Sequence, residues 1–226
     1  YEGAGRSFSV RFIKGIKSEN LGKVFEYSMK EPIRYSEDDE IEKWLFDTLL
    51  LDAEPVEISE NDAKDIALGR LIYEKPDLEK WFSEDEESLR QFFGIYILAH
   101  YRNRPRDIAI LADSPHHFLR CIRTQTDKHI VNSMHVCEEG EMTEEEVEKV
   151  IVREFTPRGN VIPSVLARHY RKKEIAFLKG WRIVRIATHP DLFGIGIGSK
   201  ALQWFTEEAK SLKLDWVGAA FGATAL

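Results

Sequence analysis

The chain has 226 residues, of which 43% are hydrophobic and 11% aromatic, enough to bury at least one sizeable core in one or two domains. Its formal net charge of -7 excludes a globally basic surface, so contacts with nucleic acid must come from local basic patches. Cys121 and Cys137 fit neither a disulfide framework nor a zinc-binding pattern and are typical of buried thiols in a reducing compartment. No apolar run reaches the roughly 20 residues that a bilayer requires, and no signal-peptide pattern is present. We therefore expect a cytoplasmic protein without a membrane partner.

The first third of the chain contains one strand pattern and one helix pattern. Residues 8–12 alternate between apolar and polar side chains, as a strand does. Ser36 is placed to cap a helix over about 38–52, whose apolar side chains at helical spacing are Ile41, Trp44, Leu45 and Leu49. Proline and glycine interrupt residues 53–82, so we place a domain boundary there, with residues 1–60 in one domain and 61–226 in the next.

The middle of the chain predicts a core helix, a hairpin and two further helices. Ser83 and Glu86 form a capping-box pattern. A helix then runs to about Tyr101, with apolar side chains at Leu89, Phe92, Phe93, Tyr96 and Ile97. Residues 118–123 and 130–137 predict two strands joined by a polar turn. Thr143 begins a short acidic helix, and residues 161–163 form a loop before a helix over 164–173.

The last third predicts a strand, a helix and a second strand. Residues 181–188 predict a buried strand and residues 214–221 the next one. Between them, residues 198–212 predict a helix with one apolar face, formed by Ala201, Leu202, Phe205, Ala209 and Leu212. The three elements make a βαβ-like unit, with a glycine-rich turn before the helix.

This turn has the chemistry of a pyrophosphate site. Gly194, Gly196 and Gly198 alternate along it, so backbone N–H groups can surround an anion without obstruction by side chains, and a helix N-terminus adds about half a positive charge. The ATP-binding Walker loop does not fit, because Ser199 precedes Lys200. The dinucleotide fingerprint does not fit either, because the third glycine comes one residue too early. The alternative is a tight turn whose glycines only let the helix pack on the strand.

The pattern that does match is Gln/Arg-x-x-Gly-x-Gly, with which acetyltransferases of the GNAT type hold coenzyme A. Gly196 and Gly198 match it, whereas Phe193 stands where the family has Gln or Arg. The resemblance implies an α/β fold, a GNAT-like mixed sheet with flanking helices. The departure at Phe193 leaves one pyrophosphate contact to the backbone or to neighbouring residues.

A longer set of segments resembles the RNA cytidine acetyltransferases, among them the tRNA(Met) cytidine acetyltransferases. They occur in the family's order, at residues 2–6 (EGAGR), 31–35 (EPIRY), 44–52 (WLFDTLLLD), 99–107 (AHYRNRPRD), 182–191 (RIVRIATHPD) and 215–224 (DWVGAAFGAT). The resemblance implies that residues 1–60 are the C-terminal part of a RecA-like ATPase or helicase domain, whose Walker loop lies before Tyr1. It makes residues 61–226 a GNAT N-acetyltransferase domain that is incomplete at its C-terminus.

The resemblance also implies the reaction and its site. The acetyl-CoA contacts fall on Ile186, Ala187, Thr188, Phe193, Gly194, Ile195, Gly196, Ile197, Gly198 and Ser199. A contact to ATP, bound with Mg²⁺ in the helicase part, falls on Arg34, which would otherwise be interpreted as a surface arginine. The implied reaction is attack of the N4 amine of cytosine on the acetyl thioester. It forms N4-acetylcytidine in RNA, at the wobble cytidine of tRNA(Met), with ATP-driven remodelling of the RNA.

The reaction needs a base that accepts the proton of the amine. The candidates are His189 and His100; alternatively His189 only caps the turn before Pro190, and His100 is a core histidine at a helix end. We expect no metal site and no catalytic role for the other histidines, His116, His117, His129, His135 and His169. Two basic patches are candidates for phosphate contacts, or else are solvated faces: Arg102, Arg104 and Arg106, and residues 168–173.

Two other functions fit the same residues. The chain could belong to a GNAT enzyme that acetylates a protein or a small amine at a rate independent of RNA. It could also be a non-catalytic binding module in which the glycine turn is only structural, and such a module would not bind acetyl-CoA.

Overall fold

A mixed five-stranded sheet organises the computed structural model, which describes residues 38–98 and 106–221 and the isolated positions 16, 23, 25, 27 and 36. The strands lie in the order in which they occur in the chain: β1 (Leu71–Glu74), β2 (His117–Thr124), β3 (Ile130–Gly140), β4 (Lys179–Thr188) and β5 (Trp216–Ala219). All neighbours are antiparallel except β4 and β5, which are parallel. The expected mixed sheet, the hairpin of β2 and β3, and the βαβ-like unit at the end are confirmed.

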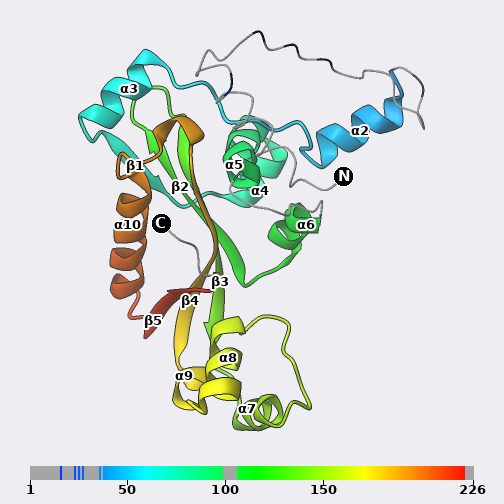
Figure 1. The fold of residues 1–226 in the computed structure, drawn as a ribbon, viewed down its shortest axis with the longest axis vertical. Helices are drawn as coiled ribbons and strands as arrows, with labels where there is room; N and C mark the ends of the chain where they lie inside the picture. Colours follow the sequence, from blue (N-terminus) through cyan, green and yellow to red (C-terminus); the bar gives the residue numbers. More distant parts are fainter. Residues whose placement is uncertain are drawn as a thin grey trace.

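Helices cover both faces of the sheet (Figure 1). On one face lie α4 (Leu78–Ser83), α5 (Glu86–Leu98) and α6 (Arg106–Asp113), and on the other lies α10 (Ile197–Ser211). Two buried clusters correspond to these faces. The first joins α5 to Leu119, Ile130 and Ala187 of the sheet, and the second joins α10 to Trp181 and Ile183 of β4. Ile186 packs against the second cluster and Ala187 belongs to the first, so these two successive residues of β4 face opposite sides of the sheet, as a strand requires.

α5 is the core helix that its apolar spacing predicts, but its start differs from the prediction. Ser83 ends α4, where its Oγ donates a hydrogen bond to the carbonyl of Glu79. α5 begins three residues later, at Glu86, and Asp85 accepts a hydrogen bond from the backbone N–H of Ser88. The capping-box assignment to Ser83 is therefore wrong, because Ser83 is the last residue of the preceding short helix, α4. The predicted end of α5 at Tyr101 lies outside the described residues.

α2 (Glu40–Thr48) is shorter than the predicted helix over 38–52. Its N-cap is Asp39, whose side chain accepts hydrogen bonds from the N–H groups of Ile41 and Glu42, and not Ser36. The predicted apolar face is not buried in the described structure, because Ile41 and Trp44 are 63% and 62% exposed. The strand predicted over 8–12 and Arg34 lie outside the described residues.

Residues 53–82, where we placed a domain boundary, contain regular elements that pack with the sheet. They form α3 (Glu60–Ala67), β1 and α4, and β1 pairs with β2 along its whole length. Two buried carboxylates hold α3 in place, since Asp62 accepts a hydrogen bond from Thr124 and Asp65 accepts one from the backbone of Thr126. These carboxylates tie α3 to the β2–β3 hairpin.

A three-helix unit lies between β3 and β4 at one end of the sheet, at the bottom of Figure 1. It consists of α7 (Glu144–Ile151), α8 (Val161–Tyr170) and α9 (Glu174–Phe177), with Val147, Val150 and Ala167 in its core. Thr143 is the N-cap of α7, as predicted, and forms a complete capping box with Glu146. The predicted loop at 161–163 is wrong, because these residues form the first turn of α8. The carboxylate of Glu139 caps that turn by accepting the N–H of Ile162, and proline is compatible with a first turn.

An ion-pair network joins α10 to strands β1 and β2. Glu208 lies between Arg120, whose Nε and Nη2 donate to its two oxygens at 2.8 Å, and the hydroxyl of Tyr73 at 2.8 Å. Lys75 Nζ is 2.7 Å from the same carboxylate. These partners lower the pKa of Glu208 to about 2 although burial alone would raise it. Of the predicted apolar face, Ala201, Phe205 and Ala209 are buried, whereas Leu202 and Leu212 are largely exposed.

In the part of the chain that the structure describes, every helix is too short or too polar to span a lipid bilayer.

Candidate functional site

The glycine turn lies where β4 separates from β5. The two strands pair only from Gly180 to Ile183 on β4, so residues 184–188 have no β5 partner among the described residues. β4 remains paired with β3 up to Thr188, which faces Asn132. The end of β4 therefore presents one backbone edge that is not used within the described sheet.

The turn itself leaves its backbone open. Gly194 and Gly196 have φ angles of +78° and +91°, which other residues rarely adopt, and no heavy atom lies within 4 Å of a Cβ added at either position. Gly196 is the N-cap of α10, and no side chain caps this helix N-terminus. The first N–H groups of α10 consequently have neither an intrahelical acceptor nor a capping side chain, and they carry the positive end of the helix dipole.

The remaining glycine brings the helix onto the end of the strand. A Cβ at Gly198 would lie 3.3 Å from Oγ1 of Thr188, and that hydroxyl oxygen accepts a hydrogen bond from Nδ2 of Asn132 at 3.1 Å. Ile197 is buried and anchors the first turn of α10 in the core. The structure thus brings together the two predicted parts of the acetyl-CoA site, the strand end at 186–188 and the turn at 193–199. Phe193 and Ile195 are 56% and 55% exposed at the rim of the turn.

A β-bulge interrupts β4 just before the strand end. Arg185 pairs with His135 and Ile183 pairs with Val136, so Val184 is an extra residue in the ladder. Bulges leave one residue unpaired and often lie beside active sites. The bulge therefore supplies irregular backbone at the point where β4 loses β5 as its neighbour, a feature that periodicity alone does not reveal.

His189 is buried and hydrogen-bonded through both ring nitrogens. Nε2 lies 2.7 Å from the carbonyl oxygen of Val56, and Nδ1 accepts the backbone N–H of Asp191 at 3.3 Å. The ring is 2% exposed. This geometry favours the capping role, because a neutral imidazole has one donor and one acceptor and both are in use. His100 and Arg34 lie outside the described residues.

A line of three polar side chains lies on the α5 face of the sheet. The hydroxyl of Tyr96 is 3.0 Å from Nδ1 of His135, and Nε2 of His135 is 2.7 Å from Nδ1 of His117. Burial lowers the pKa of His135 to about 3 and, together with Arg182, lowers the pKa of His117 below its ordinary value. Both shifts favour the neutral form of these rings at pH 7. We expected neither histidine to have a role, because only tertiary contacts place them side by side.

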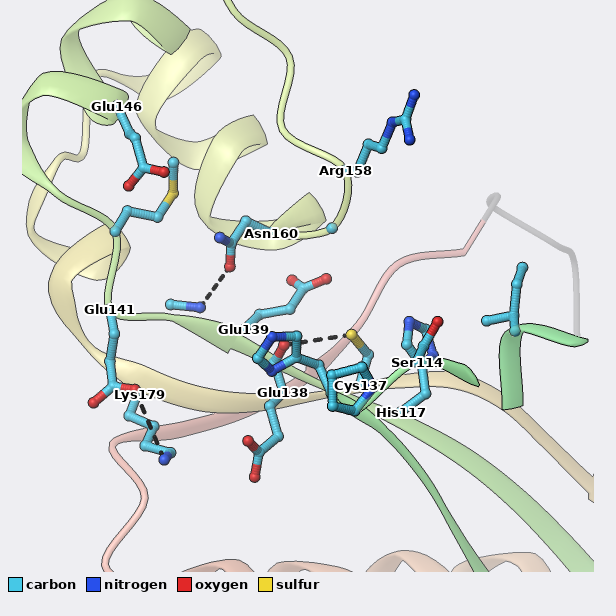
Figure 2. A pocket seen from close by; sticks show the side chains of 16 residues that line it. Ser114, His117, Cys137, Glu138, Glu139, Glu141, Glu146, Arg158, Asn160 and Lys179 are labelled. Atoms are coloured by element: carbon cyan, nitrogen blue, oxygen red, sulfur yellow. Dashed lines mark hydrogen bonds and ion pairs between the residues drawn. The ribbon is translucent and has the colours of Figure 1, made fainter. Parts of the chain in front are cut away.

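His117 lines a cavity of about 1150 Å³ between the ends of β2 and β3 and the loop before α8. Figure 2 shows His117 and Cys137 on one side of this cavity, with Asn160 and Arg158 on the other. Glu139 on its floor is buried and binds Nε of Arg182 at 2.6 Å. The cavity has both polar and apolar walls, and among the described residues the one from β4 that lines it is Lys179, at the start of the strand.

One group in the described chain has the spacing of metal ligands: Asp62, Asp127 and His129. Its atoms already bind one another or neighbouring side chains, since Asp62 contacts His129 at 2.8 Å and Asp127 accepts the hydroxyl of Ser59 at 2.5 Å. These contacts explain the group as part of the α3 attachment. The expectation of no metal site stays a prediction.

The basic patch at 168–173 is partly structural. Arg168 donates hydrogen bonds to the carbonyls of Val150 and Phe155, and Lys173 pairs with Glu148. Arg171 and Lys172 are exposed and stay candidates for a phosphate contact. The side chains of Arg102, Arg104 and Arg106 are not described. Both cysteines are free and buried, as predicted.

Two family models match the chain. Residues 91–209 match the model described as GNAT acetyltransferase 2, and residues 1–52 match RNA cytidine acetyltransferase NAT10/TcmA, helicase domain. A solved GNAT family acetyltransferase from Staphylococcus aureus aligns with a TM-score of 0.43 and 14% identity, over 68% of this chain and 88% of that chain.

Curated relatives match along almost the whole chain. It is 52% identical to tRNA(Met) cytidine acetyltransferase TmcA of Thermococcus sp. (strain AM4), over 99% of this chain and 27% of that protein. It is 48% identical to the protein of the same name from Methanopyrus kandleri, over 99% of this chain and 26% of that protein. The chain thus spans about a quarter of the length of these relatives. By the match over residues 91–209, the chain belongs to the GNAT acetyltransferase 2 family, and it is similar to RNA cytidine acetyltransferases from end to end.

Proposed function

We propose that the chain is the acetyl-CoA-binding part of an RNA cytidine acetyltransferase that forms N4-acetylcytidine, most specifically at the wobble cytidine of tRNA(Met). The observation that carries the proposal is the open glycine turn at the N-terminus of α10, which has no capping side chain. It lies beside the end of β4, which has no β5 partner in the described part of the chain. The family match and the names of the relatives support the same reaction.

The residues present fit acetyl-CoA. Gly194 and Gly196 leave room for a pyrophosphate against the N–H groups of Ile197, Gly198 and Ser199, where the helix dipole favours negative charge. Phe193 offers no side-chain donor, so this contact rests on the backbone. Ile186, Ala187 and Thr188 have no β5 partner among the described residues, and this edge would accommodate hydrogen bonds to the extended arm of coenzyme A. When bound, acetyl-CoA supplies the acetyl thioester that the amine attacks.

The protein's own contribution to the reaction is position and polarity. Cytosine N4 is a weak nucleophile because its lone pair is delocalised into the ring, so holding the amine against the thioester carbonyl is worth a large share of the acceleration. Backbone N–H groups near the bulge at Val184 would polarise that carbonyl. His100 and His189 stay hypotheses for the base, and the hydrogen bonds of His189 support a capping role for it.

An ATP-driven helicase part is also proposed, with Arg34 as a nucleotide contact and ATP bound with Mg²⁺. Its support is the match of residues 1–52 to a helicase-domain model, and the domain boundary is proposed near residue 60. A cytosine in a structured RNA must be unstacked before it reaches a buried thioester, which costs a few kcal/mol. ATP hydrolysis would drive that remodelling. A cytoplasmic location is supported by the two free thiols.

The test is acetylation of RNA by the full-length protein. With acetyl-CoA, ATP and tRNA, the wild-type protein is expected to produce N4-acetylcytidine, detected by mass spectrometry after nuclease digestion. Gly196→Glu places a carboxylate in the pyrophosphate cradle and is expected to abolish the product. The matched control, Gln203→Glu, adds the same charge at an exposed position of α10 and is expected to retain it. Acetylated peptides or polyamines without acetylated cytidine would contradict the RNA substrate.

A further inference from the structure

The buried line of Tyr96, His135 and His117 has a chemical arrangement that a purely structural core does not require. Two imidazoles and a phenol are hydrogen-bonded in sequence at 3.0 and 2.7 Å. His135 is almost completely buried and His117 is half-buried. A buried apolar contact would stabilise this position without the desolvation of two rings, so the polar chain needs another explanation.

The line lies against the part of β4 where the site is formed. His135 on β3 pairs with Arg185, the residue directly after the bulge, and the guanidinium of Arg185 lies 4.4 Å from the centre of the Tyr96 ring. The three side chains lie on the α5 face, whereas α10 packs on the opposite face. A cofactor whose phosphates bind at α10 and whose thioester reaches β4 would therefore meet its acceptor from the side on which these residues lie.

One end of the line opens toward space for a substrate. His117 lines the cavity of about 1150 Å³, and Figure 2 shows it among Cys137 and Ser114 at the cavity wall. Its Nδ1 is engaged by His135, and Nε2 has no hydrogen-bond partner among the described residues, so Nε2 is the ring nitrogen available to a ligand in that cavity. A cavity of this volume is large enough for a nucleotide.

We propose that His117 is the catalytic base of the acetyl transfer, and that His135 and Tyr96 are positioning residues that hold its ring in the reactive tautomer. In that tautomer, Nδ1–H of His117 donates to Nε2 of His135, and Nδ1–H of His135 donates to the oxygen of Tyr96. This leaves the lone pair of His117 on Nε2. The proposal rests on the proposed function, since it names the base for that reaction.

The step balances without any further reactant. The N4 lone pair of cytosine forms the N–C bond, the C–S bond breaks with its electron pair on sulfur, and the N4 proton moves to Nε2 of His117. The imidazolium then gives a proton to the coenzyme A thiolate. Neutral rings are required at the start, and the lowered pKa values of His117 and His135 meet that requirement.

The experiment compares kinetics of full-length variants with acetyl-CoA, ATP and tRNA. His117→Ala is expected to lower kcat by roughly 100-fold or more, the range of general-base catalysis, with the KM for acetyl-CoA unchanged. Added imidazole is expected to restore activity to His117→Ala but not to Gly196→Glu, whose defect lies in the cofactor cradle. Tyr96→Phe keeps the aromatic packing and is expected to lower kcat by about tenfold, again without a change in KM.

The outcomes separate the two proposals. If the wild-type protein forms no N4-acetylcytidine, the proposed function fails and this inference fails with it. If the wild type is active and His117→Ala has the wild-type kcat, only the inference is overturned. It is also overturned if imidazole does not rescue His117→Ala, or if imidazole rescues His100→Ala instead, because His100 would then be the base.

Discussion

Replacing Glu208 by Gln is expected to loosen α10, the helix whose N-terminus forms the glycine cradle. The Glu208 side chain is 8% exposed and binds Arg120, which is 10% exposed, through two hydrogen bonds. Its pKa falls from 4.5 to about 2 in the folded protein. At about 1.36 kcal/mol per pKa unit, this shift corresponds to a stabilisation on the order of 3 kcal/mol. Gln keeps the shape and removes the charge, and it leaves the buried guanidinium without a counterion.

Hydrogen exchange of the α10 amides in the full-length protein measures this effect locally. At pH 7, Glu208→Gln is expected to speed exchange in residues 197–211 by about 100-fold, the equivalent of roughly 3 kcal/mol. The matched control is Glu207→Gln, which removes the same charge from an exposed neighbour and is expected to leave exchange nearly unchanged. Equal exchange in both variants would refute the idea that the network anchors the helix.

The pH dependence provides a second check with a definite sign. A carboxylate with a lowered folded-state pKa contributes stability above its unfolded value of 4.5, and this contribution is lost as the pH falls toward about 2. The difference between wild type and Glu208→Gln is therefore expected to shrink between pH 4.5 and pH 2. A difference that stays constant over this range would contradict the assignment of the effect to Glu208.

Three further predictions follow from the packing. Gly196→Ala has free space for its methyl group but a φ of +91°, so it is expected to cost about 1 kcal/mol in stability and to weaken acetyl-CoA binding by calorimetry; unchanged affinity would contradict the cradle. Gly94→Ala would place its Cβ 2.2 Å from the carbonyl carbon of Glu54. The comparison variant is Gly69→Ala, which has only the backbone cost of a φ of +67°, since its Cβ meets just the end of Lys200 at 3.8 Å. Thermal unfolding of Gly94→Ala should occur at clearly lower temperature, and equal melting would refute the close approach. Burial raises the pKa of Cys121 to about 12 and that of Cys137 to about 11, so both thiols should resist a disulfide reagent at pH 8 until the protein unfolds, and rapid reaction in the folded protein would be inconsistent with this.

One strand, β4, contributes side chains to the cores on both faces of the sheet. β4 contributes Trp181 and Ile183 to the core under α10 and Ala187 to the core under α5. The bulge at Val184 lies between these two sets and changes which face the following residues take. As a result, a single strand reaches both the proposed cofactor cradle and the proposed base.

Local sequence was sufficient for the elements with strong periodicity or specific turn chemistry. The spacing of Phe92, Phe93 and Tyr96 predicted a core helix, and the alternating glycines predicted an open turn before α10, as observed. These features depend on interactions between residues a few positions apart, since helical periodicity and positive φ angles are properties of short segments. The resemblance of several ordered segments added the family, which the match over residues 91–209 confirms.

Only the tertiary structure decided how distant residues complete the site. Glu139 of β3 caps the helix α8, and Arg120 meets Glu208, which is 88 residues away in the sequence. His117, His135 and Tyr96 come together from two strands and a helix. A histidine in a strand has the same local pattern whether it is an inert core residue or part of a relay. Its role depends on partners that strand register and helix packing bring within hydrogen-bond distance, and short-range sequence patterns contain no record of those contacts.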